Sequence, residues 1–179
     1  MVVKGNNELI KDISNILLIQ LGDIGDVVLS LPCIRALREN FPQAKVVVAV
    51  REKAKELIED CPWATDVISV NNTKRRWIEE IAYQKDFFSR LRKYNFDLAI
   101  DLRTGTRGAI LAFLGGAKQR IGFYAHDEKP WRNWLFTNLA LPEAKPGRHI
   151  AEHYLSLLET YNIKTSHTFP EHDISKDRL

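Results

Sequence analysis

Short apolar runs recur along the chain, and segments of helical or polar character separate them. Runs of about four to eight apolar residues, rich in β-branched side chains and bounded by polar residues, are typical of buried strands. Ile16–Leu21 and Lys45–Val50 fit this description, and Asp66–Val70, Phe96–Leu102 and Gln119–Phe123 are predicted to be three further strands. We therefore predict five strands between residues 15 and 123.

Between these runs the apolar residues are spaced by three or four positions, which is the spacing of one face of a helix. The clearest series is Val27, Leu31, Ile34, Leu37 and Phe41, within which Pro32 predicts a kink. Further helices are predicted near Lys53–Asp60, from Thr73 to about Tyr94, at Gly105–Leu114 and at Ile150–Tyr161. The second of these would carry, on one side, Trp77, Ile81, Phe88 and Leu91.

Three segments lack a regular pattern. Residues 1–14 are predicted to be a polar lead-in, and residues 124–146 a loop with one turn near Trp131–Phe136. Residues 164–179 are polar and are expected to be a linker. One domain is thus predicted over residues 15–163.

Strands that alternate with helices predict an α/β fold, a Rossmann-like parallel sheet with right-handed crossovers and helices on both faces. Ligands of such sheets bind beyond the carboxyl ends of the strands. Three segments should meet there: the loop after Leu21, the segment Asp101–Arg107 and the residues that follow Val70.

Composition narrows the function without deciding it. The formal net charge of +3 is too small to indicate nucleic acid binding. Cys33 and Cys61 form no C-x-x-C pair, so we predict neither a disulfide framework nor a set of zinc ligands. No cofactor is expected. No signal peptide and no run of 18 apolar residues is recognisable, and we expect a soluble, cytoplasmic protein.

The loop after the first predicted strand reads Gly22-Asp23-Ile24-Gly25-Asp26. Its glycines have the spacing G-x-x-G, not the dinucleotide-binding G-x-G-x-x-G, and no G-K-[ST] of a P-loop follows. An aspartate at this place would also repel a pyrophosphate. The loop therefore lacks the pattern of either nucleotide site.

Two interpretations of the loop remain open. In the first, Asp26 caps a helix, Asp23 makes a turn, and Gly22 and Gly25 supply unusual backbone angles. In the second, a carboxylate at the start of a helix faces the crevice and accepts a proton from an attacking sugar hydroxyl. That role requires hydrogen-bond reach to the hydroxyl before anything else.

Three longer stretches follow one another in a familiar order: ILLIQLGDIGDVVLSLPCIRALRENFP at Ile16–Pro42, YNFDLAIDLRTGTRGAILAFLGGAKQRIGF at Tyr94–Phe123, and RHIAEHYLSLLETYNI at Arg148–Ile163. Together they resemble the signatures of the ADP-heptose:lipopolysaccharide heptosyltransferases, glycosyltransferase family nine. The resemblance implies one half of a GT-B fold, in which two Rossmann-like domains face each other across a cleft.

The resemblance also implies partners and chemistry. The N-terminal domain of the family holds the acceptor, the Kdo-containing inner core of lipopolysaccharide, and the C-terminal domain holds ADP-heptose. The reaction is an inverting heptosyl transfer that needs no metal. A peripheral contact with the inner face of the inner membrane would fit such an acceptor.

Residue roles follow from the same resemblance. Asp26 stands at the position of the proposed catalytic base. Anionic Kdo and phosphate groups suit arginine, whose guanidinium binds them through two parallel hydrogen bonds. The residues expected to contact the acceptor are Gly22, Asp23, Gly25, Arg75, Arg76, Arg103, Arg107 and His149.

Several of these roles have structural alternatives. Arg107 could be a solvated side chain at the start of a helix. His149 could likewise be an ordinary histidine at a helix start. Arg75 and Arg76 are adjacent, so both cannot face the crevice. Arg103 stands where many relatives have glutamine, which leaves the identity of the acceptor open. We assign no role to His153.

The chain differs from the family in length, since two domains would require about 150 more residues. We therefore expect the 179 residues alone to be inactive, because nothing in them would hold ADP-heptose. One alternative is a non-catalytic adaptor that keeps the half-fold. Another is a nucleotide-dependent oxidoreductase, which only the Rossmann-like layout favours.

Overall fold

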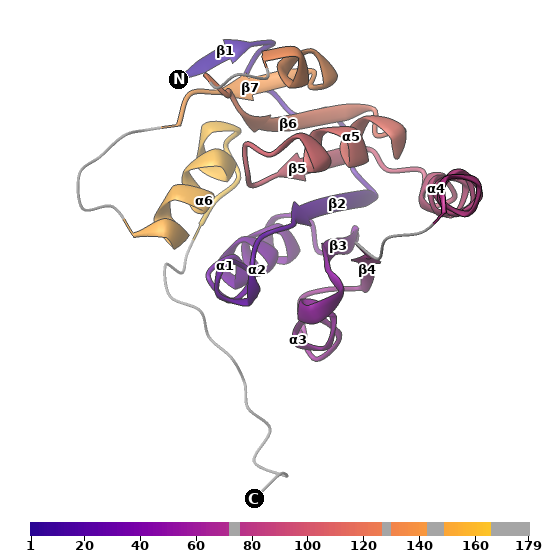
Figure 1. The fold of residues 1–179 in the computed structure, drawn as a ribbon. Coiled ribbons are helices and arrows are strands. Elements are labelled where there is room, and N and C mark those ends of the chain that lie inside the picture. The colour runs from indigo at the N-terminus through magenta and orange to yellow at the C-terminus, as the bar shows by residue number, and fades with distance from the viewer. Residues whose placement is uncertain (72–75, 127–129, 143–148, 166–179) are drawn as a thin grey trace, which may run out of the picture.

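The computed structural model describes residues 1–71, 76–126, 130–142 and 149–165. Within these residues seven strands form one sheet, in the order β1-β7-β6-β5-β2-β3-β4 (Figure 1). Neighbours from β7 to β4 are parallel, and β1 pairs antiparallel with β7. The strands are β1 (Val2–Lys4), β2 (Asn15–Gln20), β3 (Lys45–Arg51), β4 (Asp66–Val70), β5 (Leu98–Asp101), β6 (Gln119–Phe123) and β7 (Asn138–Ala140).

Helices cover both faces of the sheet, because successive side chains of each strand enter different apolar clusters. Ile16 and Leu18 of β2 pack with residues of α2, α3 and α6, whereas Leu17 and Ile19 pack with residues of α4 and α5 (Figure 1). The helices are α1 (Ile24–Val28), α2 (Leu31–Asn40), η1 (Glu52–Ala54), α3 (Lys55–Glu59), α4 (Trp77–Arg92), α5 (Thr106–Leu114), η2 (Pro130–Leu135) and α6 (Ile150–Thr160).

The predicted architecture is confirmed: all five predicted strands are present, and the central ones are parallel. The predicted turn near Trp131–Phe136 is the short helix η2.

The edge of the sheet was predicted wrongly in two places. The supposed lead-in of residues 1–14 contains β1, and the supposed loop of residues 124–146 contains β7. Each strand has three residues, too few for an alternating pattern to show. Their pairing decides their conformation: Leu141 N–H donates to the Met1 carbonyl at 2.9 Å, beside the β1–β7 register.

The segment after β2 forms two helices rather than one kinked helix. α1 ends at Val28 and α2 begins at Leu31, with the buried Ser30 between them. Pro32 lies in the first turn of α2, where its missing N–H would have no helical partner in any case. The kink predicted at Pro32 is therefore absent: the helix is interrupted before Pro32, and α1 is left as a short turn at the end of β2.

α4 is packed over only part of its length. Leu91 is 2% exposed and Phe88 is half-buried, as their shared helical face predicts. Trp77 and Ile81, which belong to the same face, are 72% and 62% exposed. The N-terminal half of α4 therefore presents apolar side chains to solvent.

Candidate functional site

Asp26 lies in the first turn of α1, at the carboxyl end of β2. The turn needs glycine at Gly22, because a Cβ atom there would overlap the Asp26 carboxylate. Gly25 has open space around its Cα, and neither glycine has a positive φ. The unusual backbone angles expected of these glycines are therefore absent. Gly22 is required because its lack of a side chain leaves room for the Asp26 carboxylate.

Three donors hold the Asp26 carboxylate. Oδ2 accepts hydrogen bonds from the Asp23 backbone N–H at 3.1 Å and from an Nη of Arg103 at 2.5 Å. Oδ1 accepts one from the Tyr154 hydroxyl at 3.0 Å. The Asp26 side chain is nevertheless 27% exposed, so it is both oriented and accessible.

Tyr154 reaches this site from α6, where its ring is part of the apolar core. Burial raises the pKa of Tyr154, and the hydrogen bond to the Asp26 carboxylate raises that pKa further. The hydroxyl is therefore protonated at neutral pH and acts as the donor. The sequence showed Tyr154 only as a member of an apolar helical stripe, so its role at the site was missed.

Arg103 follows β5, and its side chain, which is 44% exposed, pairs with the Asp26 carboxylate. Its backbone is fixed by a buried pair behind it. The Arg103 N–H donates to Oδ1 of Asp101 at 3.1 Å, and its carbonyl accepts from Arg132 at 3.3 Å. The predicted anion-binding arginine is thus present at the site, and in this structure it pairs with the predicted base.

The buried pair joins Asp101, at the end of β5, to Arg132 in η2, with Nη2 and Oδ2 3.5 Å apart. Burial raises the pKa of Asp101 to about 7, although the nearby Arg132 guanidinium lowers it in part. Arg132 also donates to the Phe123 carbonyl at 2.9 Å. Gly108 of α5 packs on Asp101, where a Cβ atom would overlap the carboxylate. The pair ties β5, β6, α5 and η2 together.

The Asp23 carboxylate pairs with two cations. Its carboxylate accepts from Lys53 at 2.6 Å and from Arg51 at 3.3 Å, and it is 72% exposed. The Lys53 hydrogen bond holds the pKa of Asp23 below its usual value, with help from the charges of Lys53 and Arg51. This arrangement links the loop after β2 to the end of β3.

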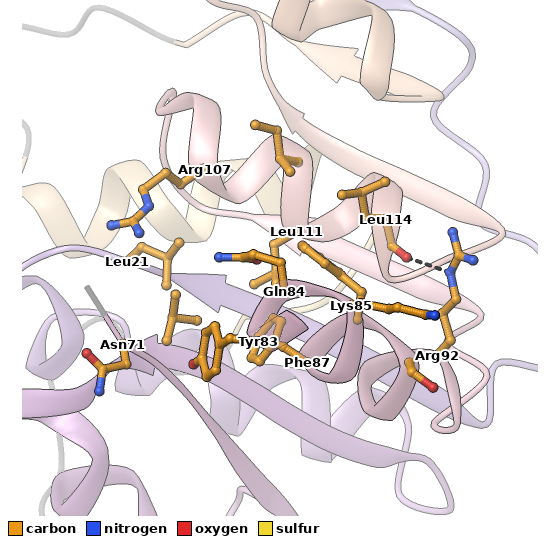
Figure 2. Close-up of a pocket in the computed structure, with 14 residues that line it drawn as sticks. Leu21, Asn71, Tyr83, Gln84, Lys85, Phe87, Arg92, Arg107, Leu111 and Leu114 are labelled. Atoms are coloured by element: carbon orange, nitrogen blue, oxygen red, sulfur yellow. Dashed lines mark hydrogen bonds between the residues drawn. The ribbon is translucent and has the colours of Figure 1, made fainter. Parts of the chain in front are cut away.

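Arg107 and His149 each lie at the start of a helix, α5 and α6 respectively. Arg75 lies outside the described residues, and Arg76 is exposed just before α4. Arg107, in the first turn of α5, is exposed and lines a hollow together with Leu21 (Figure 2). His149 is the N-cap of α6, where its Nδ1 accepts from the Ala151 N–H at 3.3 Å. The structural alternative for His149 is therefore observed.

Two further findings concern only the described part of the chain. No group of three or more His, Cys, Asp or Glu side chains gathers as a metal site. No helix there is both long and apolar enough to cross a bilayer.

Comparison with known proteins identifies the family. Residues 85–179, just over half of the chain, match the model of glycosyltransferase family 9 (heptosyltransferase). The chain belongs to glycosyltransferase family 9. The resemblance noted in the sequence is thereby confirmed by an independent match that includes β5, α5, β6 and α6.

Curated relatives in family 9 agree with this assignment. The chain is 28% identical, over 145 residues, to lipopolysaccharide heptosyltransferase 3 of Escherichia coli, covering 80% of this chain and 41% of the relative. It is 25% identical, over 162 residues, to the lipopolysaccharide core heptosyltransferase OpsX of Haemophilus influenzae, covering 89% and 44%. The chain therefore spans less than half the length of these relatives.

Solved family 9 structures share the fold. A family 9 glycosyltransferase from Veillonella parvula superposes with a TM-score of 0.72 at 23% identity, covering 89% of this chain and 44% of that one. The E. coli ADP-heptose heptosyltransferase II gives 0.70 at 20% identity, covering 90% and 47%. The prediction of a Rossmann-like half of a GT-B fold is confirmed.

Proposed function

We propose that this chain is the acceptor-binding half of a heptosyltransferase that moves heptose from ADP-heptose to the lipopolysaccharide inner core. The observation that supports it is the setting of Asp26, a partly exposed carboxylate at the carboxyl edge of a parallel sheet, oriented by Tyr154 and Arg103. Ligands of such sheets bind at this edge. The relatives named above are lipopolysaccharide heptosyltransferases.

Asp26 would act as the general base. Its Oδ2 already accepts two hydrogen bonds and Oδ1 one, so Oδ1 has room for the acceptor hydroxyl. As the acceptor oxygen bonds to the anomeric carbon of the heptose, the proton passes to Asp26. The bond from that carbon to ADP breaks, and its electron pair leaves with the diphosphate. Attack opposite to ADP inverts the anomeric centre, and the step as written uses no metal.

Arg103 would control access to the base. A Kdo carboxylate or a phosphate of the acceptor offers Arg103 a second anionic partner, which binds through two parallel hydrogen bonds. When Arg103 turns to that partner, Oδ2 of Asp26 loses its shortest contact and the adjacent positive charge. The acceptor would thereby release the base that it needs.

The other roles at the edge complete this proposal. Gly22 and Gly25 would let the acceptor approach the loop, and Asp23 would contact it or shape the loop. Arg76 and Arg107 would bind its anionic groups, as would Arg75, and His149 would lie near them. A second domain would hold ADP-heptose, so the 179 residues alone should transfer no sugar, and contact with the inner membrane would be peripheral.

The decisive experiment replaces the base in a two-domain protein that carries this chain. Asp26→Asn keeps the shape and one acceptor oxygen but cannot take up the proton. Loss of a general base slows the chemical step by about 10²–10⁴-fold, so kcat should fall by that amount while KM for the acceptor changes little. Normal turnover by Asp26→Asn would refute the assigned role.

A further inference from the structure

A separate hollow lies between α4 and α5, on the face of the sheet opposite to α6 (Figure 2). This α4–α5 groove has a volume of about 810 Å³, and its apolar wall includes Val70, Phe88, Leu111 and Leu114. Small-molecule sites typically have about 300–1,000 Å³ and similar walls. The groove is therefore large enough for a flexible apolar chain.

The charged side chains along the groove all have one sign. Lys85, Arg92 and Arg107 line it, and among the residues that the structure describes no acidic side chain does. Arg92 donates through Nε to the Leu114 carbonyl at 2.8 Å. Neither Lys85 nor Arg107 makes a hydrogen bond or ion pair within the described residues. In Figure 2, Arg107 lies at the end with Leu21 and Asn71, and Arg92 lies at the other end.

The apolar surface continues beyond the groove along α4. Trp77 and Ile81 share the helical face of Phe88, by the spacing of four and seven residues, and both are exposed. Tryptophan is favoured where one side of a ring is apolar and the other is wet. A second copy of the chain is a poor occupant, because a two-fold contact would bring Lys85 and Arg107 of both copies together.

We propose that the α4–α5 groove binds one acyl chain of an anionic membrane lipid. The chain lies along Phe88 and Leu111, the head-group phosphate lies on Arg107, and Trp77 with Ile81 lie at the membrane surface where the lipid enters. Arg107 would be shared with the acceptor site proposed above, whereas the apolar wall of the groove packs on the far face of the sheet from Tyr154. The groove's affinity for an acyl chain does not depend on whether Asp26 is a catalytic base.

The test titrates the 179-residue chain with octyl, decyl and dodecyl phosphate, each below its critical micelle concentration, by calorimetry. Each added methylene should increase the affinity about fourfold while the groove is being filled. Arg107→Gln should weaken all three ligands about tenfold, because it removes a charge-assisted hydrogen bond. Gln84→Trp, which places an indole in the groove, should abolish the dependence on chain length.

Lys45→Gln is the matched control, since it removes the same charge from an exposed position at the start of β3. Co-sedimentation should occur with mixed phosphatidylcholine and phosphatidylglycerol vesicles, not with phosphatidylcholine alone, and Gln84→Trp should abolish it. Circular dichroism verifies that each variant is folded. Equal affinity for all chain lengths, equal effects of Arg107→Gln and Lys45→Gln, or a dimer that Gln84→Trp dissociates would overturn the proposal.

Discussion

The hydroxyl of Tyr154 lies 3.0 Å from the Asp26 carboxylate, although 128 residues separate the two in the sequence. The contact joins α6 to the turn after β2, two elements that lie on the same face of the sheet. Because Tyr154 is 2% exposed, its hydroxyl has a fixed position from which to orient the carboxylate. The apolar packing of α6 thus determines how Asp26 is presented at the edge of the sheet.

The cost of losing this contact can be measured with two matched substitutions. Tyr154→Phe removes the donor to Asp26 and should lower the unfolding free energy by about 1 kcal/mol. Tyr161→Phe is the control: that hydroxyl is also buried, and it has no hydrogen-bond partner within the described residues. Its removal should leave stability unchanged or raise it. Equal losses in the two variants, by urea unfolding, would show that the contact contributes nothing specific.

The two glycines of the loop should respond differently to alanine. At Gly22 a methyl group would overlap the Asp26 carboxylate, so Gly22→Ala should cost about 1–3 kcal/mol and displace the base. Gly25 has open surroundings within α1, and Gly25→Ala should raise stability by about 0.5–1 kcal/mol. Urea unfolding of both variants measures the difference. A neutral Gly22→Ala would mean that the carboxylate is not confined as the structure shows.

The central strands could be predicted because buried parallel strands are continuous apolar runs, as Val46–Val50 of β3 is. The β1–β7 pair could not, since Val2–Lys4 and Asn138–Ala140 are short and pair although they lie far apart in the sequence. The exposure of the Trp77 side chain could not be predicted from the sequence either. Helical spacing indicates a common face, but it does not say how far that face extends beyond its partner.

The site was predictable only where a motif marked it. The loop after β2 singled out Asp26, and the resemblance of the stretch Tyr94–Phe123 to the family pointed to Arg103. Tyr154 and Arg132 carry no such signal, because one lies in an apolar stripe and the other in a segment expected to be a loop. Their roles arise from tertiary contacts with Asp26 and Asp101.

The ion pair between Arg103 and Asp26 gives a prediction about ligand charge. Arg103→Gln should weaken binding of free Kdo to the chain about tenfold, since a charge-assisted hydrogen bond to its carboxylate is lost. Binding of the Kdo methyl ester should change little. The control, Arg90→Gln, removes an exposed arginine that pairs with Asp86 on α4, at 2.9 Å. If Arg103→Gln lowers the affinity for Kdo and for its methyl ester equally, Arg103 does not bind the Kdo carboxylate.

The same substitution should hardly affect folding. Both side chains of the Arg103–Asp26 pair are partly exposed, at 44% and 27%, and such pairs contribute about 0–1 kcal/mol. Arg103→Gln should therefore shift the urea midpoint little. A large loss of stability would instead assign the pair a structural role.

The raised pKa of Asp101 predicts how the free energy of unfolding depends on pH. Burial raises the pKa of its carboxyl to about 7 in the folded chain, whereas a free aspartate titrates near 4. The folded state therefore holds this proton more tightly than the unfolded state. The resulting stabilisation is complete below about pH 4 and is lost as the pH rises through about 7.

Between pH 5 and pH 8 the unfolding free energy should accordingly fall by an amount on the order of 2 kcal/mol from this group alone. Asp101→Asn keeps an acceptor for the Arg103 N–H but does not titrate, so its stability should fall less over the same interval. The difference between the two slopes, from urea unfolding at each pH, isolates Asp101 from the histidines, which are common to both proteins. Parallel slopes would mean that Asp101 is already ionised at pH 5, held so by Arg132.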